Sequence, residues 1–302
     1  MDRFDAMRTL LAAIDGGSLT AASRALGMPL ATVSRKISDL ETHLGTRLMV
    51  RTTRRLQLTE AGAHYAASAR RILDDVDEAE RLAMGEYRAP RGHLTITAPL
   101  MFGRLHVEPV VREFLQAYPE IDVRLVLADY VVNLIDDRVD AAVRIGALPD
   151  STMVATRLGE VVWRVCASPA YIAGRGTPAV PEDVSQHDCV LFDGIYGTNV
   201  WRFGRDRDAQ AVTVKPRLSV NSAEAAIASA CGALGIIRLL SYQVREAIET
   251  GQLVRLLGAF EPEPSPVHLI HTGQAILPLK LRAFWDFAAP HLRARIPQDA
   301  QG

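Results

Sequence analysis

The sequence predicts an all-α-rich N-terminal domain, then one long helix, and then a larger α/β domain. Three patterns predict this order: apolar residues at helical spacing over the first 44 residues, a heptad repeat from Thr59 to about Met84, and short apolar strands that alternate with helices from His93 onward. Strands that alternate with helices build parallel sheets covered by helices. A chain of 302 residues also suits about two domains.

The composition is that of a soluble globular chain, with 48% hydrophobic and 23% charged residues. No apolar stretch reaches the roughly 18 residues of a membrane-spanning helix, and the N-terminus lacks a signal-peptide core. We therefore expect a cytoplasmic protein with no membrane partner. Cys166, Cys189 and Cys231 are widely spaced without a CxxC motif, so we expect no disulfide framework and no metal site, only buried small side chains.

Charge is distributed unevenly, although the net charge is only −1. Between Arg24 and Arg71, nine basic and three acidic residues give a local charge of +6, which leaves −7 for the rest of the chain. A basic segment on an otherwise acidic chain is typical of a DNA-binding domain attached to another domain.

The first helix is expected over residues 4–14 and ends at the glycine pair 16–17. Its predicted apolar face consists of Phe4, Met7, Leu10, Leu11 and Ile14. This face is expected to cap the core of the next two helices.

Residues 18–44 predict two short helices joined by a tight turn. Ser18 is a suitable N-cap, Gly27 can adopt positive φ, and Pro29 suits the start of a second helix. The inward faces are expected to contain Leu19, Ala22 and Leu26, and then Val33, Ile37, Leu40 and Leu44.

The second of these helices carries a short, polar and basic outward face. It consists of Ala31, Thr32, Ser34, Arg35 and Ser38. Such a face suits a helix that lies against base edges and phosphates. An ordinary helical hairpin with a solvated face remains the alternative.

A β-hairpin, or wing, is expected after this helix pair. Two β-prone pieces, at residues 48–50 and 56–58, flank a polar turn that contains Arg51, Arg54 and Arg55. These arginines are expected to reach a minor groove or its phosphates. A solvated basic turn is the alternative.

Residues 59–84 predict one long helix with an apolar seam at steps of three and four. The seam residues are Tyr65, Ala69, Ile72, Val76, Ala79 and Ala83. A heptad seam of this length predicts packing against a partner helix, which we expect to be the same helix of a second chain. The acidic residues at 74–78 are expected to be its solvated flank.

The remaining chain, after a Pro- and Gly-containing linker at 87–92, alternates between strands and helices. The expected strands are 94–98, 121–127, 141–145, 161–167, 189–192, 212–220, 234–239 and 267–271. The expected helices are 107–118, 131–136, 223–230, 242–249 and about 279–288.

Three blocks resemble the LysR-type transcriptional regulators, in the same order as in that family. They are ALGMPLATVSRKISDLETHLGTRL with RTTRRLQLTEAG, then TAPLMFGRLHVEPVVREFLQAYPEIDVRLVL with VDAAVRIG, and NSAEAAIASACGALGI. The resemblance implies a bacterial regulator with a winged helix-turn-helix over 1–58, a linker helix over 59–88, and an effector-binding domain over 89–302. It further implies two Rossmann-like subdomains, about 92–164 with 268–295 and about 165–267, and a small-molecule cleft between them.

The same resemblance implies partners and DNA contacts. The partners are double-stranded promoter DNA, a small-molecule effector, RNA polymerase, and further copies of the chain, as a homodimer through the linker helix and often a homotetramer. Base-reading positions fall on Leu30, Ala31 and Ser34, phosphate contacts on Thr32 and Arg35, and wing contacts on Arg51, Arg54 and Arg55. Pro29 and Leu30 replace polar residues of many members, so an apolar contact, such as one to a thymine methyl, is expected there.

Two strand-to-helix junctions predict the effector cleft. Pro99, Leu100 and Met101 form one junction, and Asn221 and Ser222 form the other. Free amides at helix N-termini favour a carboxylate or another anion. Arg144, beside Gly146, and Arg238 are further candidates for the same site, although their side chains could equally face solvent.

Alternatives to an anion site remain open. Asn221 followed by Glu224 has capping-box spacing, which explains that junction without a ligand. Met101 stands where many relatives carry a small polar residue, so a less polar effector, or a domain that only oligomerises, is also compatible.

Other function classes fit the sequence less well. A solute-binding protein would need a signal peptide and no basic head. An enzyme would need a reacting constellation, and the sequence has no G-x-S-x-G, HExxH or GxGxxG motif. We therefore expect an effector-responsive DNA-binding regulator with no catalytic residues and no cofactor.

Overall fold

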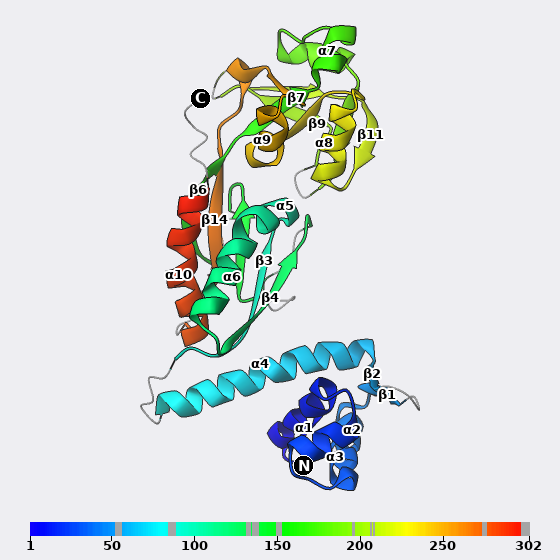
Figure 1. The fold of residues 1–302 in the computed structure, drawn as a ribbon, viewed down its shortest axis with the longest axis vertical. Coiled ribbons are helices and arrows are strands. Elements are labelled where there is room, and N and C mark those ends of the chain that lie inside the picture. The colour runs from blue at the N-terminus through cyan, green and yellow to red at the C-terminus, as the bar shows by residue number, and fades with distance from the viewer. Residues whose placement is uncertain are drawn as a thin grey trace. The chain divides into compact units, whose positions relative to one another are not determined.

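The computed structural model describes residues 1–302 except 52–55, 84–88, 131–133, 135–138, 149–152, 195–196, 206, 208, 274–276 and 297–302. It divides into two compact units, Met1–His93 and Leu94–Gly302. Figure 1 shows the helical first unit in blue and cyan and the mixed second unit in green to red.

Three helices form the core of the first unit. They are α1 (Arg3–Asp15), α2 (Leu19–Ala25) and α3 (Leu30–Leu44). The expected caps are confirmed, because the Ser18 side chain accepts a hydrogen bond from the Ala21 amide at 3.1 Å and Gly27 has φ +63°. Ser18 gives a hydrogen-bond partner to a backbone amide at the start of α2, and the positive φ of Gly27 turns the chain away from the helix at its end.

The core of these helices contains most of the predicted inward residues. Leu10, Val33, Ile37 and Leu40 are fully buried. Phe4 is 44% exposed and Leu44 is 38% exposed, so the prediction for these two was wrong. Both residues lie in the terminal turn of their helix, at the edge of the core. Helical spacing gives the face on which a side chain lies, but it does not ensure that another element covers that side chain.

The wing is confirmed as an antiparallel pair of β1 (Met49–Arg51) and β2 (Leu56–Leu58), with Met49 opposite Leu58. Its connecting residues, with Arg54 and Arg55, lie outside the described residues.

The long helix is confirmed as α4 (Glu60–Ala83), and part of its apolar seam packs within the same unit. Ala69 is buried together with Ala66 and Leu73 against Met7 and Leu11 of α1. Ile72 is 37% exposed, and Ala79 is also exposed. Because α1 lies on one flank of α4, it takes part of the apolar surface that the heptad spacing assigned to a partner.

The second unit contains two lobes. The first lobe has a five-stranded sheet in the order β4-β3-β5-β14-β6, and its helices α6 and α10 pack together through Phe114 and Phe284, whose ring centroids are 5.2 Å apart. Its elements are β3 (Gly92–Ala98), α5 (Leu100–Phe102), the π-helical segment η1 (Gly103–Val107), α6 (Glu108–Ala117), β4 (Ile121–Leu127), β5 (Ala141–Ile145), β6 (Met153–Val161), β14 (Ser265–Thr272) and α10 (Leu279–Arg295).

The second lobe contains a three-stranded sheet, β12-β7-β13, the parallel pair β8 and β11, and the antiparallel pair β9 and β10. Its elements are β7 (Trp163–Ala167), α7 (Pro169–Arg175), η2 (Pro181–Gln186), β8 (Cys189–Phe192), β9 (Val200–Phe203), β10 (Gln210–Thr213), β11 (Pro216–Val220), α8 (Ala223–Cys231), β12 (Ile237–Leu240), α9 (Ser241–Glu249), β13 (Val254–Leu256) and η4 (Gly258–Phe260).

The sheets differ from the purely parallel ones that the alternation predicts. β3 pairs with β5 in parallel, but β14 is antiparallel to both β5 and β6. The chain changes sheets at Val162 and again between β13 and Ser265. Trp163 and Arg164 therefore lie in the second lobe and Ser265 to Val267 in the first, two or three residues from the expected boundaries.

Several strands and helices begin or end at other residues than the sequence predicts. The single strand expected over 212–220 is two strands in different sheets, β10 and β11, and Pro216 starts the second. The helix expected from 107 is part of a continuous helical run that starts at Leu100. The short helix expected over 131–136 falls mostly outside the described residues.

The cysteines are free thiols in the described structure. Cys166 and Cys189 are buried, as expected, and burial raises the pKa of each thiol to about 12. Cys231 is only partly buried. Among the described helices, none is both long and apolar enough for a membrane span.

Candidate nucleic-acid interface and effector cleft

The outer face of α3 is the candidate DNA-reading surface. Leu30 is 46% exposed, Ala31 and Arg35 are exposed, and Thr32 and Ser34 are half-buried. This arrangement follows from the burial of Val33, Ile37 and Leu40 on one face of α3, because helix positions off that buried face point outward. The five candidate residues thus share one side of the helix.

Two of the basic residues in the positive segment are held by acids of α1. Lys36 forms an ion pair with Asp5, and its Nζ lies 3.5 Å from the Met28 sulfur. Arg70 forms an ion pair with Asp15, with Nη1 3.1 Å from Oδ2. Both acids precede Arg24, so a charge count over the segment alone did not include them.

Three other arginines of the segment remain available for phosphates. Arg24, Arg35 and Arg47 are exposed, and the described residues provide none of them with an ion pair. The side chain of Arg51 and all of Arg54 and Arg55 lie outside the described part. Arg71, the ninth basic residue, is half-buried on α4. The exposed arginines without an ion pair to the described residues therefore lie on α2, on α3 and directly before the wing.

The wing root, which is the segment from Arg47 to Met49, is held from two sides. Glu41 Oε1 accepts hydrogen bonds from the amides of Leu48, at 2.8 Å, and Met49, at 3.1 Å. The Leu48 carbonyl accepts from the Thr59 amide at 3.0 Å. A Cβ atom at Gly62 would lie 1.9 Å from this carbonyl oxygen, so α4 starts in close contact with the wing root.

The first-lobe junction of the predicted cleft offers fewer exposed groups than the sequence predicts. Leu100 is 39% exposed, but Pro99 and Met101 are buried. The Leu100 amide donates a 3.0 Å hydrogen bond to Asp129 Oδ1. A carboxylate of the protein itself thus occupies the helix N-terminus that was expected to bind an anion.

Burial is the main cause of a raised pKa for Asp129. The hydrogen bond from Leu100 opposes this rise, and the nearby negative charge of Glu224 adds to it. The ionised form of Asp129 is therefore less favourable here than in water.

The second-lobe side of the cleft is capped by Ser222, not by Asn221. Ser222 Oγ accepts from the Ala225 amide at 3.3 Å and donates to Glu224 Oε2 at 3.1 Å. The capping-box interpretation with Asn221 was wrong by one residue. Asn221 is thereby left exposed beyond the helix start.

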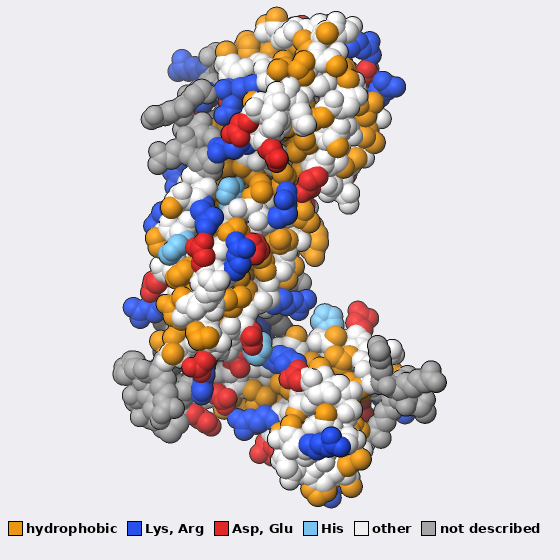
Figure 2. Space-filling model, viewed as in Figure 1, with side chains coloured by type: hydrophobic (Ala, Val, Ile, Leu, Met, Phe, Trp, Pro, Cys, Tyr) orange, Lys and Arg blue, Asp and Glu red, His pale blue; other side chains and the backbone are white. Residues whose placement is uncertain are grey.

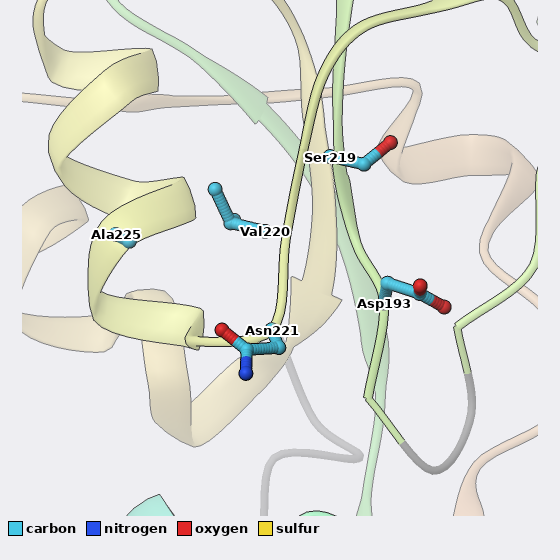
Figure 3. A pocket seen from close by; sticks show the side chains of 5 residues that line it. All are labelled: Asp193, Ser219, Val220, Asn221 and Ala225. Carbon is cyan, nitrogen blue, oxygen red and sulfur yellow. The ribbon is translucent and has the colours of Figure 1, made fainter.

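Asn221 lines an open pocket of about 390 Å³ at the carboxyl ends of β8 and β11 (Figure 3). The other lining residues are Asp193, Ser219, Val220 and Ala225. Of the eight predicted effector residues, Asn221 alone lines this pocket. Asp193, which directly follows a strand, was missed, although ligands of open α/β sheets bind at such strand ends.

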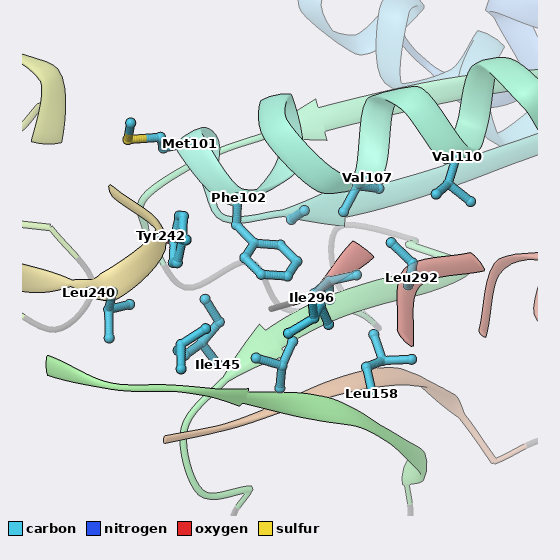
Figure 4. Close-up of a cluster of buried hydrophobic side chains, with 14 of the residues drawn as sticks. Met101, Phe102, Val107, Val110, Ile145, Leu158, Leu240, Tyr242, Leu292 and Ile296 are labelled. Carbon is cyan, nitrogen blue, oxygen red and sulfur yellow. The ribbon is translucent and has the colours of Figure 1, made fainter. Parts of the chain in front are cut away.

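Charged and aromatic contacts join the two lobes. Arg104 Nη2 lies 3.5 Å from Glu224 Oε1. The rings of Phe102 and Tyr242 meet edge to face with centroids 5.2 Å apart, and Figure 4 shows them beside Leu240 and Ile145. The lobes therefore already share an apolar and a charged contact.

The remaining candidate residues have structural partners. The Arg238 guanidinium lies 4.5 Å from the Trp163 ring centre and donates to the Arg202 carbonyl at 3.1 Å, and burial lowers its pKa to about 10. Gly146 has φ +103° and donates to the Pro266 carbonyl at 2.8 Å. Arg144 is half-buried in β5, opposite His268 of β14.

Family models match nearly the whole chain. The model described as "Bacterial regulatory helix-turn-helix protein, lysR family" matches residues 4–63, and the "LysR substrate binding domain" model matches residues 88–293. The chain belongs to the LysR-type transcriptional regulators. The bounds of the two models follow the helical head and the two-lobed α/β unit.

Relatives and solved structures match this chain over almost their full length. An HTH-type transcriptional repressor of Pseudomonas aeruginosa is 33% identical over 286 residues, which cover 94% of this chain and 90% of the relative. The structure of CrgA, a LysR-type regulator from Neisseria meningitidis, matches with TM-score 0.60 and 31% identity, over 95% of this chain and 98% of that one. The full-length Vibrio cholerae virulence activator AphB matches with TM-score 0.60 and 26% identity, over 94% and 97%.

The family gives each part of this LysR-type chain a role. The first unit contains the DNA-binding helix-turn-helix, and the second contains the effector-binding α/β domain. The relatives are named as transcriptional regulators and not as enzymes. Figure 2 shows acidic and basic side chains interspersed over the visible face of the second unit.

Proposed function

We propose that this regulator binds promoter DNA as a homodimer or homotetramer and responds to a small organic effector bound in its second unit. The observation that carries the DNA-binding half is the exposed face of α3, with Leu30, Ala31 and Arg35 outward and Val33 buried. A helix with such a face fits the major groove. The proposed domains are 1–58 for DNA, 59–88 for dimerisation and 89–302 for the effector.

The proposed DNA contacts divide into two kinds. Leu30, Ala31 and Ser34 contact base edges, and Thr32 and Arg35 contact the backbone. The wing adds phosphate or minor-groove contacts through Arg51, Arg54 and Arg55. Because Leu30 is apolar, discrimination at its position comes from shape and methyl contacts, and hydrogen-bonded readout is left to Ser34.

The proposed effector binds at the strand ends near Asn221. One amide at each helix start already has a side-chain partner, Asp129 for Leu100 and Ser222 for Ala225, so an anion gains less here than the sequence suggests. Binding changes the angle between the lobes at Val162 and at residues 262–264. The linker helices transmit this change to the spacing of the two α3 helices, and hence to DNA bending and RNA polymerase in the cytoplasm.

A second candidate function has support from the contacts between the lobes. Arg104 with Glu224 and Phe102 with Tyr242 hold the lobes together without any ligand. A domain held in this way can serve oligomerisation alone.

One experiment separates these two functions. Operator DNA recovered by in vitro selection with the full chain is labelled at both ends, and its bending is followed by energy transfer while small-metabolite fractions are added. A fraction that changes the bend of the wild type and not of Asn221→Ala supports the effector function. Metabolite-independent bending across all fractions supports oligomerisation alone. A selection that enriches no DNA contradicts the DNA-binding proposal itself.

A further inference from the structure

Glu41 connects the DNA-reading helix to the wing through the protein backbone. It lies in the last third of α3, is half-buried, and places Oε1 2.8 Å from the Leu48 amide and 3.1 Å from the Met49 amide. Met49 is the first residue of β1. One carboxylate oxygen thus joins the two elements proposed to contact DNA.

The wing root also packs on the apolar side of α3, because Leu48 and Met49 belong to the same buried cluster as Val33, Ile37 and Leu40. Leu48 is 1% exposed, and its carbonyl is bound by the Thr59 amide at the start of α4. Thr59 Oγ1 also donates to the Arg47 carbonyl at 2.7 Å. Thr59, directly before α4, thus makes two hydrogen bonds to the wing root. Among the described contacts, Glu41 is the α3 side chain that hydrogen-bonds to the wing root.

We infer that Glu41 is a positioning residue for DNA binding, which sets the wing against α3 so that both engage one site. The inference rests on the proposed DNA contacts of α3 and the wing. A carboxylate on a DNA-binding helix repels phosphates, so electrostatics alone predicts that its removal strengthens binding. The positioning role predicts the opposite result for Glu41.

The test compares Glu41→Ala with Asp39→Ala in the full-length protein. Asp39 is an exposed carboxylate on the same helix. Both changes remove one negative charge from α3, but only Glu41 is bonded to the wing root. The probe is the operator recovered by in vitro selection, with affinity measured by fluorescence anisotropy over a salt series and contacts measured by hydroxyl-radical footprinting.

We expect Glu41→Ala to bind about tenfold more weakly, with a salt slope smaller by about one because a wing phosphate contact is lost. Its footprint should lose the protection that flanks the α3 half-site and keep the protection in its centre. Glu41→Gln retains an acceptor oxygen and should restore both slope and footprint. If Glu41→Ala fails to fold, Glu41→Asp, which keeps the charge but shortens the side chain, should give the same loss of slope and flanking protection.

Equal affinities and footprints for Glu41→Ala and Asp39→Ala would overturn the inference. So would a Glu41→Ala variant whose weaker binding leaves the slope and the flanking protection unchanged, because that result describes a general loss of stability. Failure of the wild type to select or bind DNA would instead refute the proposed function.

Discussion

Asp129 Oδ1 accepts a 3.0 Å hydrogen bond from the backbone amide of Leu100, the first residue of α5. The two residues come from neighbouring strand ends, β4 and β3, that the sheet brings together. A helix start that was predicted to bind an external anion is therefore satisfied from within the protein. At the other side of the cleft, Ser222 has the same effect on α8.

Asp129→Asn should stabilise the protein near neutral pH. Burial raises the pKa of Asp129, so the ionised form is less favourable in the folded state than in the unfolded chain. A carboxyl whose pKa is raised by folding contributes its stability at low pH and loses it as pH rises through the folded-state value. Asparagine keeps an acceptor for the Leu100 amide without the charge. Thermal unfolding should thus give a higher Tm for the variant at pH 7.

The same comparison at low pH is the control. Where the wild-type carboxyl is protonated, at and below about pH 4, the advantage of asparagine should shrink toward zero. A wild type that is more stable than Asp129→Asn at pH 7 would show that the ionised carboxylate is favoured at this position.

Arg35→Ala should weaken DNA binding uniformly across sequences. Arg35 is exposed on α3 without an ion pair to the described residues, so its loss removes one phosphate contact and lowers the salt slope by about one. Anisotropy titrations over a salt series measure the slope. Arg282→Ala, which removes an exposed arginine from α10 of the second unit, is the matched control and should leave the slope unchanged.

Lys36→Ala should behave differently from Arg35→Ala, although the residues are adjacent. Lys36 is paired with Asp5 of α1, so its removal should lower the free energy of unfolding by up to about 1 kcal/mol and leave the salt slope intact. Chemical denaturation of Lys36→Ala, Asp5→Ala and the double variant measures the coupling. A slope reduced as far as in Arg35→Ala would show that Lys36 contacts phosphate.

Ile72→Asp should weaken the proposed dimer. Ile72 is 37% exposed in the middle of α4, on the part of the seam that α1 does not cover. A charge placed in a helix-to-helix contact should raise the dimer dissociation constant by at least about tenfold, as measured by analytical ultracentrifugation. Ala67→Asp adds the same charge to an exposed position elsewhere on α4. Equal dissociation constants for the two variants would place the dimer contact away from Ile72.

The head was predictable because its signals are local. The Ser18 cap, the Gly27 turn and the spacing of Val33 and Ile37 each act within a few residues, and all of them are confirmed. The residues that escaped prediction depend on neighbours far along the chain. Lys36 and Asp5 are 31 residues apart, and no periodicity within α3 reveals that pair.

The cleft was harder to predict for the same reason. Leu100 and Asp129 meet because two strands align, a relationship that helical spacing does not contain. The sequence also does not show which of Asn221 and Ser222 caps α8, because both are good capping residues. In the structure, Ser222 accepts from the Ala225 amide. Sequence patterns thus placed the junctions correctly, but could not decide which groups there are already bonded.

A footprint of the full-length protein on its selected operator tests whether a dimer reads DNA through α3 and the wing. We expect two protected half-sites whose centres lie about one helical turn apart, roughly 34 Å, or a multiple of that, with protection that weakens steeply as salt is raised. A single protected half-site, or protection that is insensitive to salt, would contradict a dimeric regulator that reads DNA through α3 and the wing.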